Sequence, residues 1–90
     1  MFFYDYILKS KGSDKLYVGF TSNLIRRVKE HNLGLNTSTK AYRPWVLIYY
    51  EACRNRIDAK RRENYLKTNK GAMLLKRRLH EYFRDLLRFA

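Results

Sequence analysis

Cysteine and proline are almost absent from the sequence, which contains one of each, Cys53 and Pro44, among its 90 residues. One cysteine cannot form an internal disulfide or a zinc site built on paired cysteines, so two common ways of stabilising a small secreted domain are excluded. Long apolar runs are absent as well, and no basic stretch precedes the apolar residues at the amino terminus. We therefore expect a cytoplasmic protein with no membrane association and no disulfide partner.

Acidic residues are also few, with eight Asp and Glu against twenty Lys and Arg and a net charge of +12. So much positive charge on a small body attracts polyanions, and nucleic acid is the leading candidate partner. Charge alone leaves two other classes open. One is a basic RNA-binding protein of the ribosomal kind, and the other is a protein that adheres to anionic membranes through an exposed basic amphipathic helix.

Hydrophobic residues make up 46% of the chain and no stretch reads as a linker, so we expect a single domain over residues 1–90. Periodicity and turn residues predict six elements and one loop. They are strands at 2–9, 15–20 and 45–51, a helix capped by one of residues 21–23, a polar, phosphate-binding loop at 33–44, a helix from Asn55 to about 67, and a last helix at about 71–88. This order predicts an α/β chain of the α+β type. Its small, three-stranded, largely antiparallel sheet has helices packed on it in the order β-β-α-β-α plus a C-terminal helix.

The first two strands carry tyrosines that fall on one face of the predicted sheet. We place Tyr6 opposite Tyr17 and Ile7 opposite Leu16, which puts the phenols on one face and the aliphatic side chains on the other. In this register Gly19 leaves room beside the two phenols. Because tyrosine is common in β-strands, the simplest interpretation is that both tyrosines only stabilise the sheet.

Arg27 and His31 are four residues apart, so they share one face of the predicted helix, on or beside an apolar stripe of Leu24, Val28 and Leu35. Each has two interpretations. Arg27 is either one more solvated cation or a forked donor to phosphodiester oxygens, and His31 is either a hydrogen-bonded core residue or a catalytic one. Spacing alone leaves both pairs open.

Glu63 lies on the apolar stripe of the helix predicted after Asn55, between Ala59 and Leu66. A carboxylate on a core-facing stripe needs a partner. That partner is either a cation, such as Lys67 or an arginine of another element, or a divalent metal ion, because Mg²⁺ in phosphate chemistry is often held by one or two carboxylates.

Three segments together closely resemble the GIY-YIG nuclease superfamily. They are YDYILKS, KLYVGFTSNLIRRVKEHN and RPWVLIYYEACRNRIDAKRRENYLK, and they carry the two tyrosine strands, an N-L-x-R-R-x-x-x-H helix and a glutamate-bearing helix in the family's order. The resemblance is strongest to small stand-alone bacterial members, which are similar to the amino-terminal nuclease domain of the excision-repair incision protein. It covers about residues 2–70 and leaves 71–90 as a C-terminal helical extension.

The resemblance implies a metal-dependent endonuclease that hydrolyses DNA phosphodiester bonds, structure-specific and linked to repair or recombination. It assigns catalytic roles to Tyr6, Tyr17, Arg27 and His31, and binding of Mg²⁺ or Mn²⁺ to Glu63. Tyr17, or His31 acting with it, would accept a proton from the attacking water, and Arg27 would stabilise charge on the phosphoryl oxygens. The substrate-binding candidates are Gly19, Arg26, Thr37, Ser38, Lys40 and Arg43.

Two points of biology stay open at this stage. One site cuts one strand, so a homodimer or a protein partner would be needed to cut both strands in one visit. The alternative to an enzyme is a basic nucleic-acid-binding module with no independent nuclease activity, whose binding would depend strongly on salt.

Overall fold

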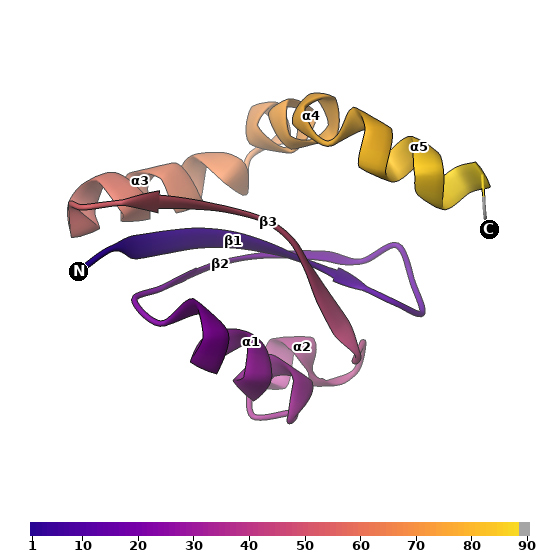
Figure 1. Cartoon of the computed structure of the whole chain (residues 1–90), viewed down its shortest axis with the longest axis horizontal. Helices are drawn as coiled ribbons and strands as arrows, with labels where there is room; N and C mark the ends of the chain where they lie inside the picture. The colour runs from indigo at the N-terminus through magenta and orange to yellow at the C-terminus, as the bar shows by residue number, and fades with distance from the viewer. Residues whose placement is uncertain (89–90) are drawn as a thin grey trace.

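The computed structural model describes residues 1–88, and a three-stranded antiparallel sheet lies at its centre (Figure 1). Strand β1 (Phe3–Ser10) lies between β2 (Leu16–Thr21) and β3 (Trp45–Cys53) and is antiparallel to both. Tyrosine, phenylalanine and β-branched residues make up much of these strands, as expected for a pleated, half-buried surface. The predicted α+β class and antiparallel sheet are confirmed.

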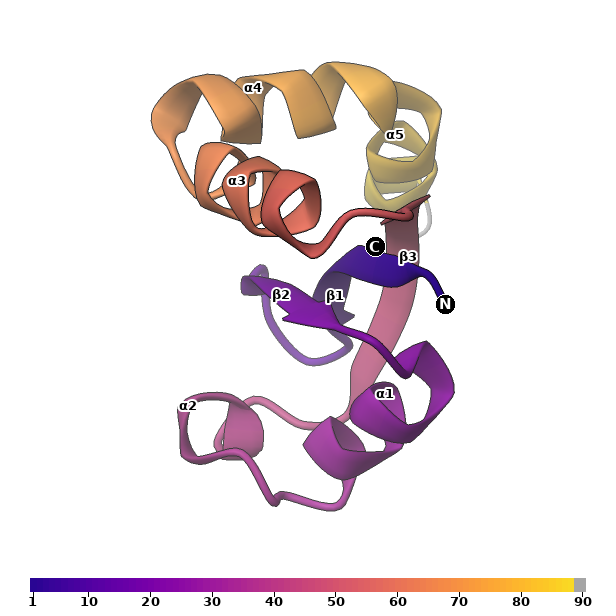
Figure 2. The same ribbon diagram turned by 90° about the vertical axis from the view of Figure 1, so that its left-hand side faces the viewer.

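Helices cover both faces of the sheet (Figures 1 and 2). On one side are α1 (Leu24–Asn32) and the four-residue α2 (Thr37–Lys40). On the other side are α3 (Arg56–Leu66), α4 (Asn69–Arg78) and α5 (His80–Arg88). No helix within residues 1–88 is both long enough and apolar enough to span a membrane.

Each face of the sheet has its own small core, because side chains alternate along a strand. Tyr6, Leu8 and Trp45 are buried on the α1 side, with Leu24 and Val28 of α1 packed against them. The cluster on the α3 side consists of Ile7, Leu66 and Leu75, with Val18, Ile48, Tyr49 and Leu74 packed around it. The three strands therefore pack against a separate layer of helices on each face of the sheet.

The predicted pairing of β1 with β2 is wrong by two residues. Tyr6 pairs with Gly19 and Leu8 with Tyr17, whereas we expected Tyr6 opposite Tyr17. A shift of two residues preserves the faces, so the two tyrosines still share one side of the sheet. The reason for the register is steric: a Cβ on Gly19 would lie 2.3 Å from Cζ and from the hydroxyl oxygen of Tyr6, so only glycine lets this ring lie across β2.

The predicted loop at 33–44 also needs correction, because α2 lies within it. The Asn36 side chain accepts a hydrogen bond from the Ser38 N–H and caps this turn, as Asn23 caps α1 through the Arg26 N–H. Gly34, at φ 80°, turns the chain out of α1. Leu35 then lies outside the helix and is 70% exposed, so its place on the predicted apolar stripe is wrong.

The last predicted helix is two helices. Leu79, with φ −106° and ψ 28°, ends α4, and α5 continues from His80 in a new direction. Gly71 and Leu75 are buried, so α4 packs into the core, whereas α5 has no buried residue. The predicted extension therefore divides into a packed half and an exposed half, and its last two positions, 89–90, lie outside the described residues.

Candidate active site

A buried chain of hydrogen bonds links β1 to the two helices on the α1 side. The Tyr6 hydroxyl oxygen lies 2.7 Å from His31 Nε2, and His31 Nδ1 lies 2.7 Å from Thr39 Oγ1. The Thr39 hydroxyl in turn donates to the carbonyl oxygen of Asn36 at 3.4 Å. Tyr6 is 1% exposed and the other two side chains are 0% exposed, so this chain is closed to solvent.

One arrangement of protons satisfies every group in this chain. Because Thr39 donates to Asn36, its oxygen accepts from His31 Nδ1–H, and the other imidazole nitrogen accepts from the Tyr6 hydroxyl. Burial lowers the pKa of His31, and the charge of Arg27 lowers it further. Burial also raises the pKa of Tyr6 to about 12, although Arg27 opposes the rise. Both rings are therefore neutral at pH 7 and reach a substrate only through other residues.

Tyr17 and Arg27 are the accessible members of the same cluster. The Tyr17 ring is half-buried and packs edge-on against His31, with ring centroids 4.9 Å apart. The Arg27 side chain is 33% exposed, and one terminal nitrogen donates to Glu30 Oε1 at 3.2 Å. Burial works against the charge of Arg27, but the neighbouring Tyr6 hydroxyl and Glu30 carboxylate outweigh it and raise its pKa. A permanent cation thus stands beside a phenol at the edge of the buried chain.

The six predicted substrate-binding residues are distributed unevenly. Gly19 is buried beneath the Tyr6 ring and does not face solvent. Arg26 is exposed on α1, 3.9 Å from Glu30. The exposed remainder belongs to α2 and the segment after it, where Arg43 donates to the Lys40 carbonyl and packs over Gly34; these residues are Thr37, Ser38, Lys40 and Arg43.

Glu63 lies on α3, on the other side of the sheet from α1. It is 5% exposed, and its two oxygens lie 2.9 Å from Lys60 Nζ and 3.0 Å from Lys67 Nζ. Burial favours the protonated acid, but hydrogen bonds from the two lysines outweigh it and bring the pKa of Glu63 below its ordinary value. Both interpretations from the sequence therefore meet here: the carboxylate has cation partners, and it is ionised, as a metal ligand must be.

The donor set fits a divalent ion held by one carboxylate. Among residues 1–88 no group of three or more His, Cys, Asp or Glu side chains is placed to bind a metal. Mg²⁺ often uses one or two carboxylates, with water and substrate oxygens completing its shell. Lys60 and Lys67 now occupy both Glu63 oxygens, but their side chains are 45% and 50% exposed, so each has room to swing away.

The two parts of the predicted site are not in direct contact. Within residues 1–88, no hydrogen bond or ion pair joins Glu63 to Tyr6, Tyr17, Arg27 or His31. Glu63 nevertheless adds a small increase to the pKa of Tyr6, which places the carboxylate within electrostatic reach of the tyrosine cluster. The structure thus gathers four predicted residues on one side of the sheet and places the fifth across it.

Asp5 is a buried acid of β1, at a position where this chain departs from the family's first signature. It is 3% exposed on the α3 side, and its Oδ1 is the only buried side-chain oxygen or nitrogen within residues 1–88 that lacks a hydrogen-bond partner. Burial raises the pKa of Asp5 to about 6, with further increases from Glu51 and Glu63, against the opposing charges of Arg62 and Lys60.

Asp5→Val is expected to stabilise the fold above pH 6. The pKa of Asp5 is about 6 in the folded chain against an ordinary 3.8, so the unfolded chain ionises first as pH rises. The wild type should therefore lose about 3 kcal/mol of unfolding free energy between about pH 4 and 6 and stay at that level above. Urea denaturation without divalent ions, from pH 4 to 8, measures this loss. Asp5→Asn should also lack it, and an unchanged pH dependence in both variants would contradict the assignment.

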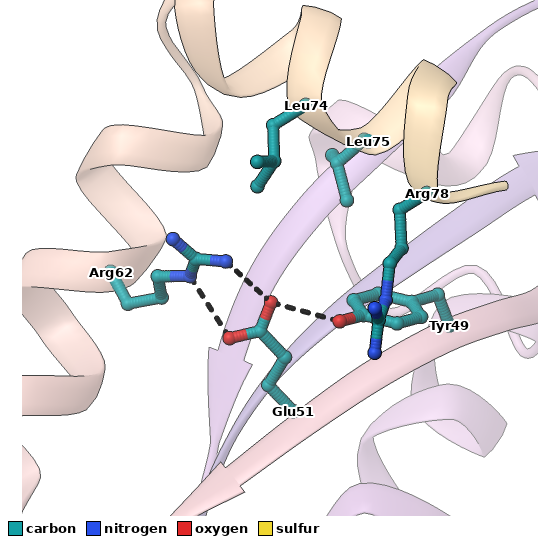
Figure 3. A pocket seen from close by; sticks show the side chains of 6 residues that line it. All are labelled: Tyr49, Glu51, Arg62, Leu74, Leu75 and Arg78. Atoms are coloured by element: carbon teal, nitrogen blue, oxygen red, sulfur yellow. Dashed lines mark hydrogen bonds and ion pairs between the residues drawn. The ribbon is translucent and has the colours of Figure 1, made fainter.

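A hollow of about 370 Å³ lies away from the tyrosine cluster, between β3, α3 and α4 (Figure 3). Arg62 holds Glu51 through two nitrogens at 2.9 and 3.0 Å, and the Tyr49 hydroxyl donates to the same carboxylate at 3.1 Å. Leu74, Leu75 and Arg78 form its other wall. Because Glu51 and Arg62 satisfy each other, this network fastens α3 to β3 and carries no part of the predicted site.

Thr39 and Trp45 are the parts of the tyrosine cluster that the sequence did not reveal. Thr39 binds His31, and the Trp45 indole N–H donates to the Thr39 carbonyl at 2.8 Å. Thr37 and Ser38 carry hydroxyls in the same segment, but only the turn of α2 brings the hydroxyl of Thr39 to His31. A buried histidine needs a partner for each ring nitrogen, and that requirement was the available signal.

The family model of the GIY-YIG catalytic domain matches residues 2–78. The chain belongs to the GIY-YIG family, and the match extends beyond the predicted 2–70 through α4. A nuclease-like role follows from that membership.

Among known proteins the chain is similar to members of the group called UPF0213. The UPF0213 protein CPE1444 of Clostridium perfringens is 43% identical over 65 residues, which cover 71% of this chain and 69% of that protein. The UPF0213 protein SH2523 of Staphylococcus haemolyticus is 42% identical over 66 residues, covering 72% and 79%. The solution NMR structure of the UPF0213 protein BH0048 from Bacillus halodurans, 29% identical, matches with a TM-score of 0.52 over 83% of this chain and 82% of that one.

Proposed function

We propose that this chain is a divalent-metal-dependent endonuclease that hydrolyses DNA phosphodiester bonds. The observation that carries the proposal is the meeting of Tyr6, Tyr17, Arg27 and His31, from β1, β2 and α1, in one cluster with a solvent-facing cation at its edge. Family membership and the net charge of +12 point to the same polyanionic substrate.

The accessible residues of the cluster take the direct roles. Arg27 binds the nonbridging oxygens of the scissile phosphate and stabilises the charge that develops there. Tyr17, whose ring lies beside that region, takes the proton of the attacking water on its hydroxyl oxygen and passes its own hydroxyl proton to solvent. Tyr6 and His31 are positioning residues. The buried hydrogen-bond chain fixes their rings, and these rings form the surface against which Tyr17 and Arg27 pack.

Glu63 would hold Mg²⁺ or Mn²⁺ once Lys60 and Lys67 release its oxygens. The chemistry that such an ion would supply there is polarisation of a phosphoryl oxygen and activation of a water. The two lysines, once released, are cations next to the same place and can bind the backbone of the DNA.

Arg27→Ala is expected to lower DNA cleavage by about 10²-fold, the typical effect of removing one preorganised donor to a developing oxyanion. The assay uses plasmid and labelled single-stranded, duplex, flapped and branched DNA, each with Mg²⁺, Mn²⁺ or chelator. Lys29→Ala is the control, since it removes one exposed charge from the same helix. Salt-dependent binding with no product from any DNA under either ion would instead identify a binding module.

A further inference from the structure

Asp5 carries a buried carboxyl oxygen that nothing in the described chain binds. The residue is 3% exposed, and its Oδ1 has no hydrogen-bond partner within residues 1–88. A buried polar atom without a partner costs free energy, so its presence in a folded chain needs an explanation. The groups that pair with a carboxylate oxygen are hydrogen-bond donors and cations.

The register of the sheet fixes which side chains lie beside Asp5. It pairs with Phe20 of β2 and with Glu51 of β3. Directly opposed residues of an antiparallel pair point to the same face, with Cβ atoms about 5 Å apart. Helix α3 lies over this part of the sheet (Figure 2). The Asp5 carboxyl group is therefore enclosed between the strands and α3.

Lys60 shows that Glu63 of α3 reaches the same layer. Lys60 Nζ lies 2.9 Å from Glu63 Oε1 and 5.1 Å from the centroid of the Phe20 ring, and Phe20 is the β2 partner of Asp5. After burial, which raises the pKa of Asp5 most, the charges of Glu51 and Glu63 raise it further. Such an effect requires carboxylates within electrostatic reach of one another.

The cations whose charge reaches Asp5 are bound to other acids. They are Arg62 and Lys60. Arg62 holds Glu51 through two nitrogens, and Lys60 pairs with Glu63. Neither donates to Asp5 Oδ1 in the part of the chain that the structure describes. The layer thus contains one more carboxylate than its neighbouring cations contact.

A divalent ion would satisfy Asp5 and Glu63 together. Mg²⁺ and Mn²⁺ prefer carboxylate oxygens, and one or two carboxylates are the usual protein share of a Mg²⁺ site. An ion that displaces Lys60 from Glu63 replaces one positive charge by two, so a second carboxylate balances the added charge. The Lys60 side chain is 45% exposed and can leave, whereas Asp5 stays buried beside the place that it vacates.

We propose that Asp5 is a second carboxylate ligand, with Glu63, of a divalent ion bound between β1 and α3. The inference rests on the metal-binding role proposed for Glu63 and adds to it a ligand from the strand below. Because Asp5 stands where this chain departs from the family's first signature, the second ligand belongs to chains that have an acid at this position.

Mn²⁺ binding in the absence of DNA tests the proposal. The electron paramagnetic resonance signal of free Mn²⁺ falls as the ion binds, so the affinity is measured independently of cleavage. Asp5→Asn keeps the shape of the side chain and should weaken Mn²⁺ binding about tenfold or more, since even indirect partners of a metal site contribute that much. Asp58→Asn removes an exposed negative charge from α3, and as the control it should change the affinity less than about twofold.

Thermal unfolding with and without Mn²⁺ gives a second readout, with a variant that is expected to fold well. Asp5→Val should be more stable than the wild type without metal, because it removes the unpartnered carboxyl group. Mn²⁺ should stabilise the wild type by mass action and the variant much less. The advantage of Asp5→Val should therefore shrink as Mn²⁺ is added, whereas a purely structural role of Asp5 predicts a constant advantage.

The outcomes separate this inference from the proposed function. Wild-type Mn²⁺ affinity in Asp5→Asn, with weakened binding in Glu63→Gln, would remove Asp5 from the site and leave its Oδ1 to an ordered water. No Mn²⁺ binding by the wild type, or no effect of either substitution, would overturn both ligands. Weakened Mn²⁺ binding in both variants, together with no DNA cleavage by the wild type, would keep the two-carboxylate site and remove the nuclease.

Discussion

Glu63→Gln should reduce DNA cleavage by about 10³-fold or more while leaving DNA binding intact or stronger. The expected size corresponds to the several kcal/mol by which a metal ion stabilises transition-state charge. Glutamine keeps the shape of the side chain and one acceptor oxygen for Lys60 or Lys67, but it cannot supply the negative charge that holds a divalent ion. Binding should not weaken, because the change adds to a net charge that is already +12.

Cleavage and binding of the same labelled DNA, measured over a range of Mn²⁺ and Mg²⁺ concentrations, test this prediction. Asp58→Asn is the control because Asp58 is also on α3 and also pairs with a cation three residues away, Arg61, but its side chain is 58% exposed. That variant should cleave within about twofold of wild type, since exposed ion pairs contribute little. Equal activity of Glu63→Gln and wild type would show that the metal is held elsewhere.

Gly19→Ala should destabilise the fold by about 4 kcal/mol and lower cleavage by more than about tenfold. The new Cβ would lie 2.3 Å from Cζ and from the hydroxyl oxygen of Tyr6, and Tyr6 is 1% exposed and cannot move aside without displacing its neighbours. Overpacking of this kind costs about 1–3 kcal/mol, and loss of the buried bond from Tyr6 to His31 adds a similar amount. The displaced ring would also remove the packing surface that positions Tyr17 and Arg27.

Chemical denaturation and the plasmid assay measure the two effects. Gly12→Ala is the matched control, because a Cβ at Gly12 has no atom within 4 Å. It should change stability by less than about 0.5 kcal/mol, as is usual for surface substitutions. If Gly19→Ala matched Gly12→Ala in stability, the close packing of Tyr6 on β2 would be wrong.

The division of the site between two faces of the sheet bears on how it works. The side with α1 contributes a cation and a phenol that rest on neutral, buried residues, and the side with α3 contributes an ionised carboxylate held by two lysines. A metal ion and the two lysines would compete for the Glu63 carboxylate, because all of them carry positive charge. An arriving phosphate backbone that attracts the lysines would therefore favour metal binding at Glu63. If Glu63 holds the ion as proposed, water and substrate oxygens would complete the metal's shell.

The amino-acid sequence by itself determined the strands, the start of α3 at Asn55, a cap for α1 among residues 21–23, and the placement of Arg27 and His31 on one helix face. These depend on alternation, helical spacing and cap chemistry, which act over a few neighbouring residues. Only the tertiary structure decided the register that seats Tyr6 on Gly19, and only it selected Thr39 as the partner of His31. It also placed Glu63, whose local pairing with Lys67 the sequence predicted, across the sheet from Tyr6. These contacts depend on steric fit and on the pairing of buried polar groups between distant segments, and no local pattern records either one.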